Sequence, residues 1–161
     1  AAGFAYGQLQ YFGEKNTIFS SQAFDSKALS RANYIQTSAL IRLAAFNAVG
    51  GFDRGFDLRE DWELFIRLWH YGWKGAYLPR PVIQYRKHRP KAQVRAQGKF
   101  RKRLSEAKLI TLYPKFFWQK LVRHPLRYLI YRTRYKVGNL IGRHGPSGSV
   151  TKIHPKTETS E

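Results

Sequence analysis

The stretch 50–72, which reads GGFDRGFDLREDWELFIRLWHYG, constrains the fold of this chain more than any other. Its apolar residues recur at the i, i+3, i+4, i+7 spacing of a helix with one buried face: Trp62, Phe65, Ile66 and Trp69. Gly72 follows them and can adopt the left-handed conformation that ends a helix. The pattern therefore predicts a short amphipathic helix with Glu60 and Asp61 in its first turn.

Two acids at a helix start suit an ionised state, because the free N–H groups and the positive end of the helix dipole stabilise each carboxylate by about 0.3–1 kcal/mol. Residues 50–57 are rich in glycine and aspartate, which is typical of a turn-rich loop that borders a cleft. A carboxylate in that position can accept a proton from a substrate hydroxyl. The alternative is that Glu60 and Asp61 are ordinary helix-start acids, which are common.

The rest of the first 90 residues predicts a mixed α/β domain, for which 161 residues are long enough. Residues 3–19 suit two short strands in a hairpin, and 20–32 form a polar loop in which 27–30 can make a short helical turn. Further strands are expected at 38–42, 74–78 and 82–86, with a turn at Pro79–Pro81 and a brief helix at 43–49.

A set of short motifs occurs in a fixed order along this region: Asn33, Ser38, Arg42, Gly50-Gly51-Phe52-Asp53, Glu60-Asp61-Trp62 and Tyr85-Arg86-Lys87-His88. In this order they closely resemble the C-terminal, acceptor-side half of family 2 glycosyltransferases, which have the GT-A fold. The resemblance is strong from Asn33 to His88 and looser over residues 1–32. It implies a mixed sheet with flanking helices over residues 1–90. The family's N-terminal half, with its metal-binding Asp-x-Asp, has no counterpart here. Asp25-Ser26-Lys27 does not supply that motif, because lysine stands where the second aspartate should be. The chain is therefore expected to be a piece of a longer protein and inactive alone.

The resemblance also implies roles for individual residues. Asp61 would be the general base, and Arg86 and His88 would contact the donor diphosphate, with His88 as a ligand of Mn²⁺ or Mg²⁺. Without the resemblance, Arg86 and His88 are simply the surface end of a strand within a basic run. The residues expected to orient or shape the acceptor site are Glu60, Trp62, Gly50, Gly51 and Phe52, although Trp62 has a competing role as a core anchor.

The implied activity is transfer of a sugar, with inversion, from a nucleotide-sugar donor to a sugar or lipid-linked acceptor in the synthesis of a cell-surface polysaccharide or glycolipid. The implied location is cytoplasmic, either free or peripheral on the inner face of the membrane. The chain has no cysteine, which agrees with a reducing compartment. It also has no apolar run long enough to span a bilayer.

The net charge of +19 lies mostly in the C-terminal part of the chain. Eighteen Lys or Arg residues lie between Arg86 and Arg143, against one acid, Glu106. Such a field attracts phosphates of lipid headgroups, nucleotides or nucleic acid. A basic module that binds nucleic acid or a membrane surface without catalysis is therefore the alternative function, although no helix-turn-helix, zinc-finger or ribonucleoprotein motif supports binding to nucleic acid.

Residues 91–141 predict basic amphipathic helices as an extension of the domain. In residues 97–112 the expected apolar stripe consists of Phe100, Leu104, Ala107 and Thr111. Two partners remain open for the apolar faces of the extension: an anionic membrane surface, or the rest of the enzyme. Residues 142–161 are expected to form a disordered tail.

Overall fold

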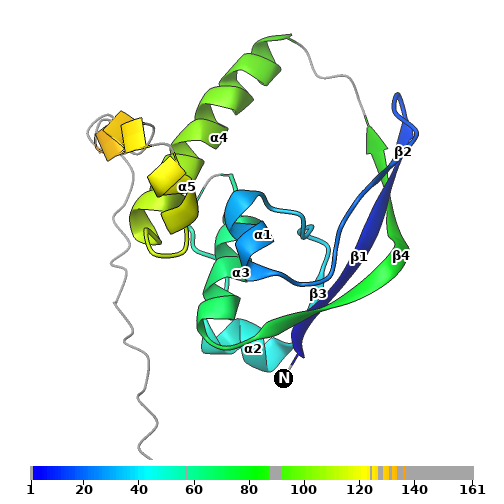
Figure 1. Cartoon of the computed structure of the whole chain (residues 1–161). Helices are drawn as coiled ribbons and strands as arrows, with labels where there is room; N and C mark the ends of the chain where they lie inside the picture. The colour runs from blue at the N-terminus through cyan, green and yellow to red at the C-terminus, as the bar shows by residue number, and fades with distance from the viewer. Residues whose placement is uncertain are drawn as a thin grey trace, which may run out of the picture.

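The computed structural model describes residues 2–56, 58–87 and 92–123, together with 125, 126, 129, 130, 132, 133 and 136; within 92–123 it leaves out the side chains of 92–97 and 100. The described part is a mixed α/β fold, as predicted (Figure 1). Its elements are β1 (Ala2–Gly13), β2 (Thr17–Phe19), α1 (Ser26–Arg31), β3 (Leu40–Ile41), α2 (Leu43–Ala48), α3 (Glu60–His70), β4 (Lys74–Lys87), α4 (Ala92–Leu112) and α5 (Trp118–Arg123). His88 and the expected tail, 142–161, lie outside the described residues.

Strand β1 is the centre of the sheet. It pairs antiparallel with β2 near its C-terminal end and with β3 near its N-terminal end, and it pairs parallel with β4 along nearly its whole length. Phe4 has partners in both β3 and β4, and Leu9 has partners in both β2 and β4, so β4 occupies one edge of β1 while β2 and β3 share the other. Helices α1, α3, α4 and α5 lie on the same side of this sheet (Figure 1).

The two strands expected at 74–78 and 82–86 are one continuous strand, which corrects the predicted turn at Pro79–Pro81. Leu78 pairs with Gly7 and Pro81 with Gln8, so the residues between them bulge out of the ladder. A bulge lets proline enter a strand because the missing N–H is not required there. Gly7 makes the close approach feasible, since a Cβ at this position would lie 2.9 Å from the carbonyl oxygen of Arg80.

Helix α3 begins and ends as its sequence predicts. Glu60 and Asp61 occupy the first turn, and Gly72 has a φ of +82° just beyond the C-terminal cap. The buried surface is broader than one stripe, because α3 is covered from two sides: Phe65 packs on Phe4 of β1 at 5.0 Å between ring centroids. On the second side, Trp62 packs against Phe117 and Trp69 against Phe116. Leu64 and Leu68, which the stripe did not include, are also fully buried.

The C-terminal half of α4 and the turn after it belong to the same core. Leu109, Ile110 and Phe117 are at most 1% exposed and form one cluster with α3 and β1. Of the expected α4 stripe, Ala107 is buried, Leu104 and Thr111 are half-buried, and the side chain of Phe100 is outside the described set. The helical extension is therefore packed on residues 1–90 over part of its surface. In the part of the chain that is described, no helix is both long enough and apolar enough to cross a bilayer.

Candidate functional site

The start of α3 borders an open cavity of about 350 Å³. Its floor and walls come from β1, β2, the loop after α1, the N-terminal end of α3 and one residue of α4. The lining residues are Tyr11, Phe19, Asn33, Ile35, Gln36, Leu58, Arg59, Glu60, Asp61 and Lys102. Segments distant in the sequence thus meet around the two acids that the sequence singled out.

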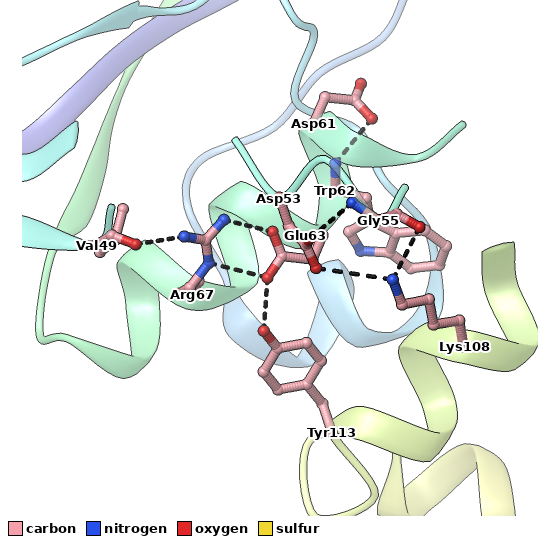
Figure 2. Close-up of polar contacts among 9 residues, drawn as sticks. All are labelled: Val49, Asp53, Gly55, Asp61, Trp62, Glu63, Arg67, Lys108 and Tyr113. Atoms are coloured by element: carbon pink, nitrogen blue, oxygen red, sulfur yellow. Dashed lines mark hydrogen bonds and ion pairs between the residues drawn. The ribbon is translucent and has the colours of Figure 1, made fainter. Parts of the chain in front are cut away.

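The carboxylate of Asp61 is held by three donors. Its Oδ2 accepts hydrogen bonds from Asn33 Nδ2 at 3.0 Å and from Thr37 Oγ1 at 3.1 Å. Its Oδ1 accepts one from the backbone N–H of Trp62 at 2.7 Å (Figure 2). Asn33 is itself fixed, since its Oδ1 accepts from the N–H of Ile35 at 3.2 Å. The carboxylate therefore has a defined orientation at the edge of the cavity and keeps lone pairs for a further partner.

Asn33 and Thr37 have no assigned role in the sequence-based site. Asn33 belongs to the first motif of the family pattern, which is a signal that it contributes to the site. Thr37 carries no such signal, because its contact with Asp61 depends on a loop that returns to α3 from 24 residues earlier in the chain.

Arg59 places a cation directly before the two acids. It has a φ of +70°, a left-handed conformation that costs a non-glycine residue about 1–3 kcal/mol. Its guanidinium carbon lies 5.1 Å from the centre of the Trp62 ring, and its buried Nε has no hydrogen-bond partner among the described residues. With Lys102, it gives the cavity two cations beside the carboxylates of Glu60 and Asp61.

Trp62 points into the core rather than into the cavity. Its side chain is 1% exposed, its Nε1–H donates to the carbonyl of Leu29 at 2.9 Å, and its ring packs edge-on against Phe117. This geometry favours the core-anchor role over the expected contact with an acceptor. The aromatic walls of the cavity are instead Tyr11 and Phe19.

The Gly50-Gly51-Phe52 turn lies away from the residues that line the cavity. Gly50 and Gly51 have φ values of +79° and +73°, which lets the chain turn sharply after α2. The turn follows Val49, whose carbonyl accepts a hydrogen bond from Arg67. Arg67 is in the last turn of α3, about 9 Å along the helix axis beyond Asp61, so the turn lies toward the C-terminal end of α3 rather than at its N-terminal end.

Arg86 lies on the face of the sheet opposite to the one that borders the cavity. It pairs with Phe12, and its guanidinium lies 5.2 Å from the centre of that ring. The neighbouring residues of β4 lie on the face of Tyr11, because side chains alternate along a strand: the Tyr85 and Tyr11 ring centroids are 6.0 Å apart, and Lys87 Nζ is 4.6 Å from the Tyr11 ring. Lys87 is therefore closer to the cavity wall than the expected Arg86.

Glu63 is a buried acid that the sequence analysis did not identify. It is 2% exposed, and both of its oxygens accept from Arg67, at 2.9 Å and 2.6 Å (Figure 2). Tyr113 donates a third hydrogen bond at 2.6 Å from the segment after α4. Burial and the adjacent Glu63 charge raise the pKa of Tyr113. Burial lowers the pKa of Arg67, but its hydrogen bonds and ion pair with Glu63 outweigh this effect and raise it. The i, i+4 spacing of Glu63 and Arg67 is the sequence feature from which this ion pair could have been predicted.

Lys108 of α4 holds the loop that leads to the cavity. Its Nζ donates to the carbonyl of Gly55 at 2.8 Å and lies 3.7 Å from Asp53 Oδ2 (Figure 2). Asp53 also closes the turn, since its Oδ1 accepts from the N–H of Gly55 at 2.7 Å. The loop before α3 is thus fixed by a residue more than 50 positions later in the sequence.

His70 gives a pH-dependent stability that can be measured. Partial burial against Trp69, Tyr113 and Phe116, which leaves part of the ring exposed, lowers the pKa of His70 from the ordinary value of 6.5. Below pH 6.5 the unfolded chain takes up a proton that the folded chain resists, so the free energy of unfolding falls as the pH falls below 6.5. Urea unfolding at about pH 7.5 and about pH 5.5 should show a smaller loss for His70→Gln than for wild type. An equal loss in both proteins would show that other groups cause the pH dependence.

Comparisons of the chain with protein-family models, with curated proteins and with solved structures gave no match.

Proposed function

We propose that this chain is the acceptor-side part of an inverting glycosyltransferase and that Asp61 is its general base. The observation that carries the proposal is the orientation of the Asp61 carboxylate at the edge of the cavity by donors from Asn33, Thr37 and the α3 backbone. A base of this kind needs a fixed direction and an open side for the substrate hydroxyl. The order of sequence motifs supplies the reaction class by resemblance.

In the proposed reaction, Asp61 accepts the proton of an acceptor hydroxyl while that oxygen attacks the anomeric carbon of a nucleotide sugar. The bond to the diphosphate breaks on the opposite face, and the nucleoside diphosphate leaves with the bonding electron pair. Among the described residues, no three His, Asp or Glu side chains come together as a cation site. Positive charge on the leaving side would come from a divalent ion held mainly by the donor-binding half, with His88, which lies outside the described residues, as the ligand that the resemblance gives to this chain.

The cavity has the size and lining that an acceptor sugar requires. Its volume of about 350 Å³ lies within the range of small-molecule sites, roughly 300–1,000 Å³. Tyr11 and Phe19 offer apolar surface for the C–H face of a sugar ring, while Gln36 and Glu60 offer hydrogen-bond partners for its hydroxyls. The product class that fits the resemblance is a cell-surface polysaccharide or glycolipid, assembled from the cytoplasmic side.

The test is sugar transfer by the protein that joins this chain to its donor-binding half, screened over nucleotide sugars with Mn²⁺ or Mg²⁺. Asn33→Leu removes one donor from the Asp61 carboxylate. Since a hydrogen bond to a charged group contributes about 1.5–3 kcal/mol, this change should lower kcat by about 10- to 100-fold and leave the donor KM unchanged. The matched control is Asn47→Leu, an exposed position on α2 that should keep wild-type kinetics. Equal kinetics for both variants would contradict a role for the Asp61 orientation.

A further inference from the structure

Helix α5 has an inner face and an outer face of different character. On the inner side, Lys120 donates to Glu106 at 2.7 Å and lies over the Trp62 ring, while Leu121 packs partly against the core. On the outer side, Trp118 is 65% exposed and Val122 is 56% exposed. The fold therefore uses one side of α5 and presents large apolar side chains to solvent on the other.

The apolar exposure continues beyond α5. Leu126, Leu129 and Ile130 are 74%, 57% and 47% exposed. Trp118 and Val122 lie one helical turn apart on α5, and Leu126, Leu129 and Ile130 continue the apolar stripe beyond its end at Arg123 with an i, i+3, i+4 spacing of their own. Leu109 and Ile110 of α4 pack on the chain's own core, whereas the residues of this stripe remain exposed and therefore need a different partner.

Basic residues surround the stripe without acidic ones to balance them. Lys115, Arg123, Arg132 and Lys136 are exposed, and the sequence holds no Asp or Glu between positions 107 and 157. A partner that buries the stripe must therefore be apolar at its centre and negatively charged around it. The interface of a membrane that contains anionic lipids has this combination, since acyl chains lie beneath a layer of charged headgroups.

We propose that Trp118 and Val122 on the outer face of α5, with Leu126, Leu129 and Ile130 after it, bind to the surface of an anionic lipid membrane. Trp118 would lie at the level of the headgroups, Val122 and the leucines just below them, and the lysine and arginine side chains would contact lipid phosphates. Nucleic acid fits this surface less well, because a phosphate backbone offers nothing that buries aliphatic side chains. The inference is independent of the proposed sugar transfer.

The test is binding of the whole chain to phosphatidylcholine vesicles with and without about 30 mol% phosphatidylglycerol. The W118S/V122S double variant should reduce the partition coefficient on the anionic vesicles by at least about 10-fold, because apolar burial contributes much of the binding. Its control is L40S/L43S, which removes two residues that are 78% and 70% exposed elsewhere on the surface. The control should bind the vesicles like wild type, and all variants should have the unfolding temperature of wild type.

Two further readouts keep the surface assignment falsifiable. Brominated anionic lipid should quench part of the tryptophan emission of wild type, and Trp118→Phe should remove that part. Equal vesicle binding by W118S/V122S and wild type would overturn the proposal. Stronger binding to a random oligonucleotide than to anionic vesicles would also overturn it, because the basic residues would then bind nucleic acid rather than lipid headgroups.

Discussion

Asp61→Asn should lower kcat for sugar transfer by about 10²–10⁴-fold, which is the usual contribution of a general base. The asparagine side chain is nearly isosteric and its oxygen can still accept from Asn33 and Thr37. Its amide would face the N–H of Trp62, so one hydrogen bond to a charged group, about 1.5–3 kcal/mol, is lost without loss of the fold. The measurement is kcat and donor Kd on the complete enzyme, with the urea midpoint to verify folding.

Glu60→Gln provides the contrast for that variant, because it changes an acid to an amide one residue away in the same turn and the same cavity. It should raise the acceptor KM and change kcat much less, since Glu60 is assigned to orienting the acceptor. If both variants lose kcat equally, the site has no single base. If Asp61→Asn keeps near wild-type kcat, Asp61 is only a helix-start acid.

The features that the sequence predicted well depend on local physics. The bounds of α3 follow from an apolar repeat within one helix and from a glycine that can take positive φ at its end. The position of Asp61 in the first turn follows directly from those bounds. The surroundings of Asp61 could not be derived in the same way, because Asn33 and Thr37 contact its carboxylate from 28 and 24 residues earlier in the chain.

The features that the sequence predicted poorly depend on contacts between distant segments. The continuity of β4 rests on a bulge opposite Gly7, and the face on which Arg86 lies follows from the register after that bulge. The sequence shows that the side chains of Tyr85, Arg86 and Lys87 alternate between the two faces of the sheet. It does not show which of these faces borders the cavity. Likewise, an apolar stripe cannot say what covers it, so the burial of Trp62 beneath Phe117 was one of two open readings.

Glu63→Ala should lower the free energy of unfolding by about 3–5 kcal/mol, the usual cost of breaking a buried ion pair. The change leaves the guanidinium of Arg67 and the hydroxyl of Tyr113 without their acceptor in a site that is largely closed to water. Arg67 also donates to Val49, which precedes the Gly50-Gly51 turn, so the loss should loosen the approach to α3 as well. The measurement is urea unfolding at neutral pH.

The matched variant removes the whole network at once. Replacing Glu63 by leucine, Arg67 by methionine and Tyr113 by phenylalanine deletes every charged or hydroxyl group of the cluster while it keeps similar volumes. Replacement of a complete buried pair by apolar residues is often neutral, so this triple variant should unfold at nearly the wild-type urea concentration. If the triple variant is as unstable as Glu63→Ala, the loss of stability comes from packing. The hydrogen bonds of Glu63 would then not be what stabilises the contact between α3 and the segment after α4. If Glu63→Ala itself hardly changes the free energy of unfolding, water reaches the cluster and replaces the carboxylate. The stabilisation by the Glu63–Arg67 pair would then not depend on its burial.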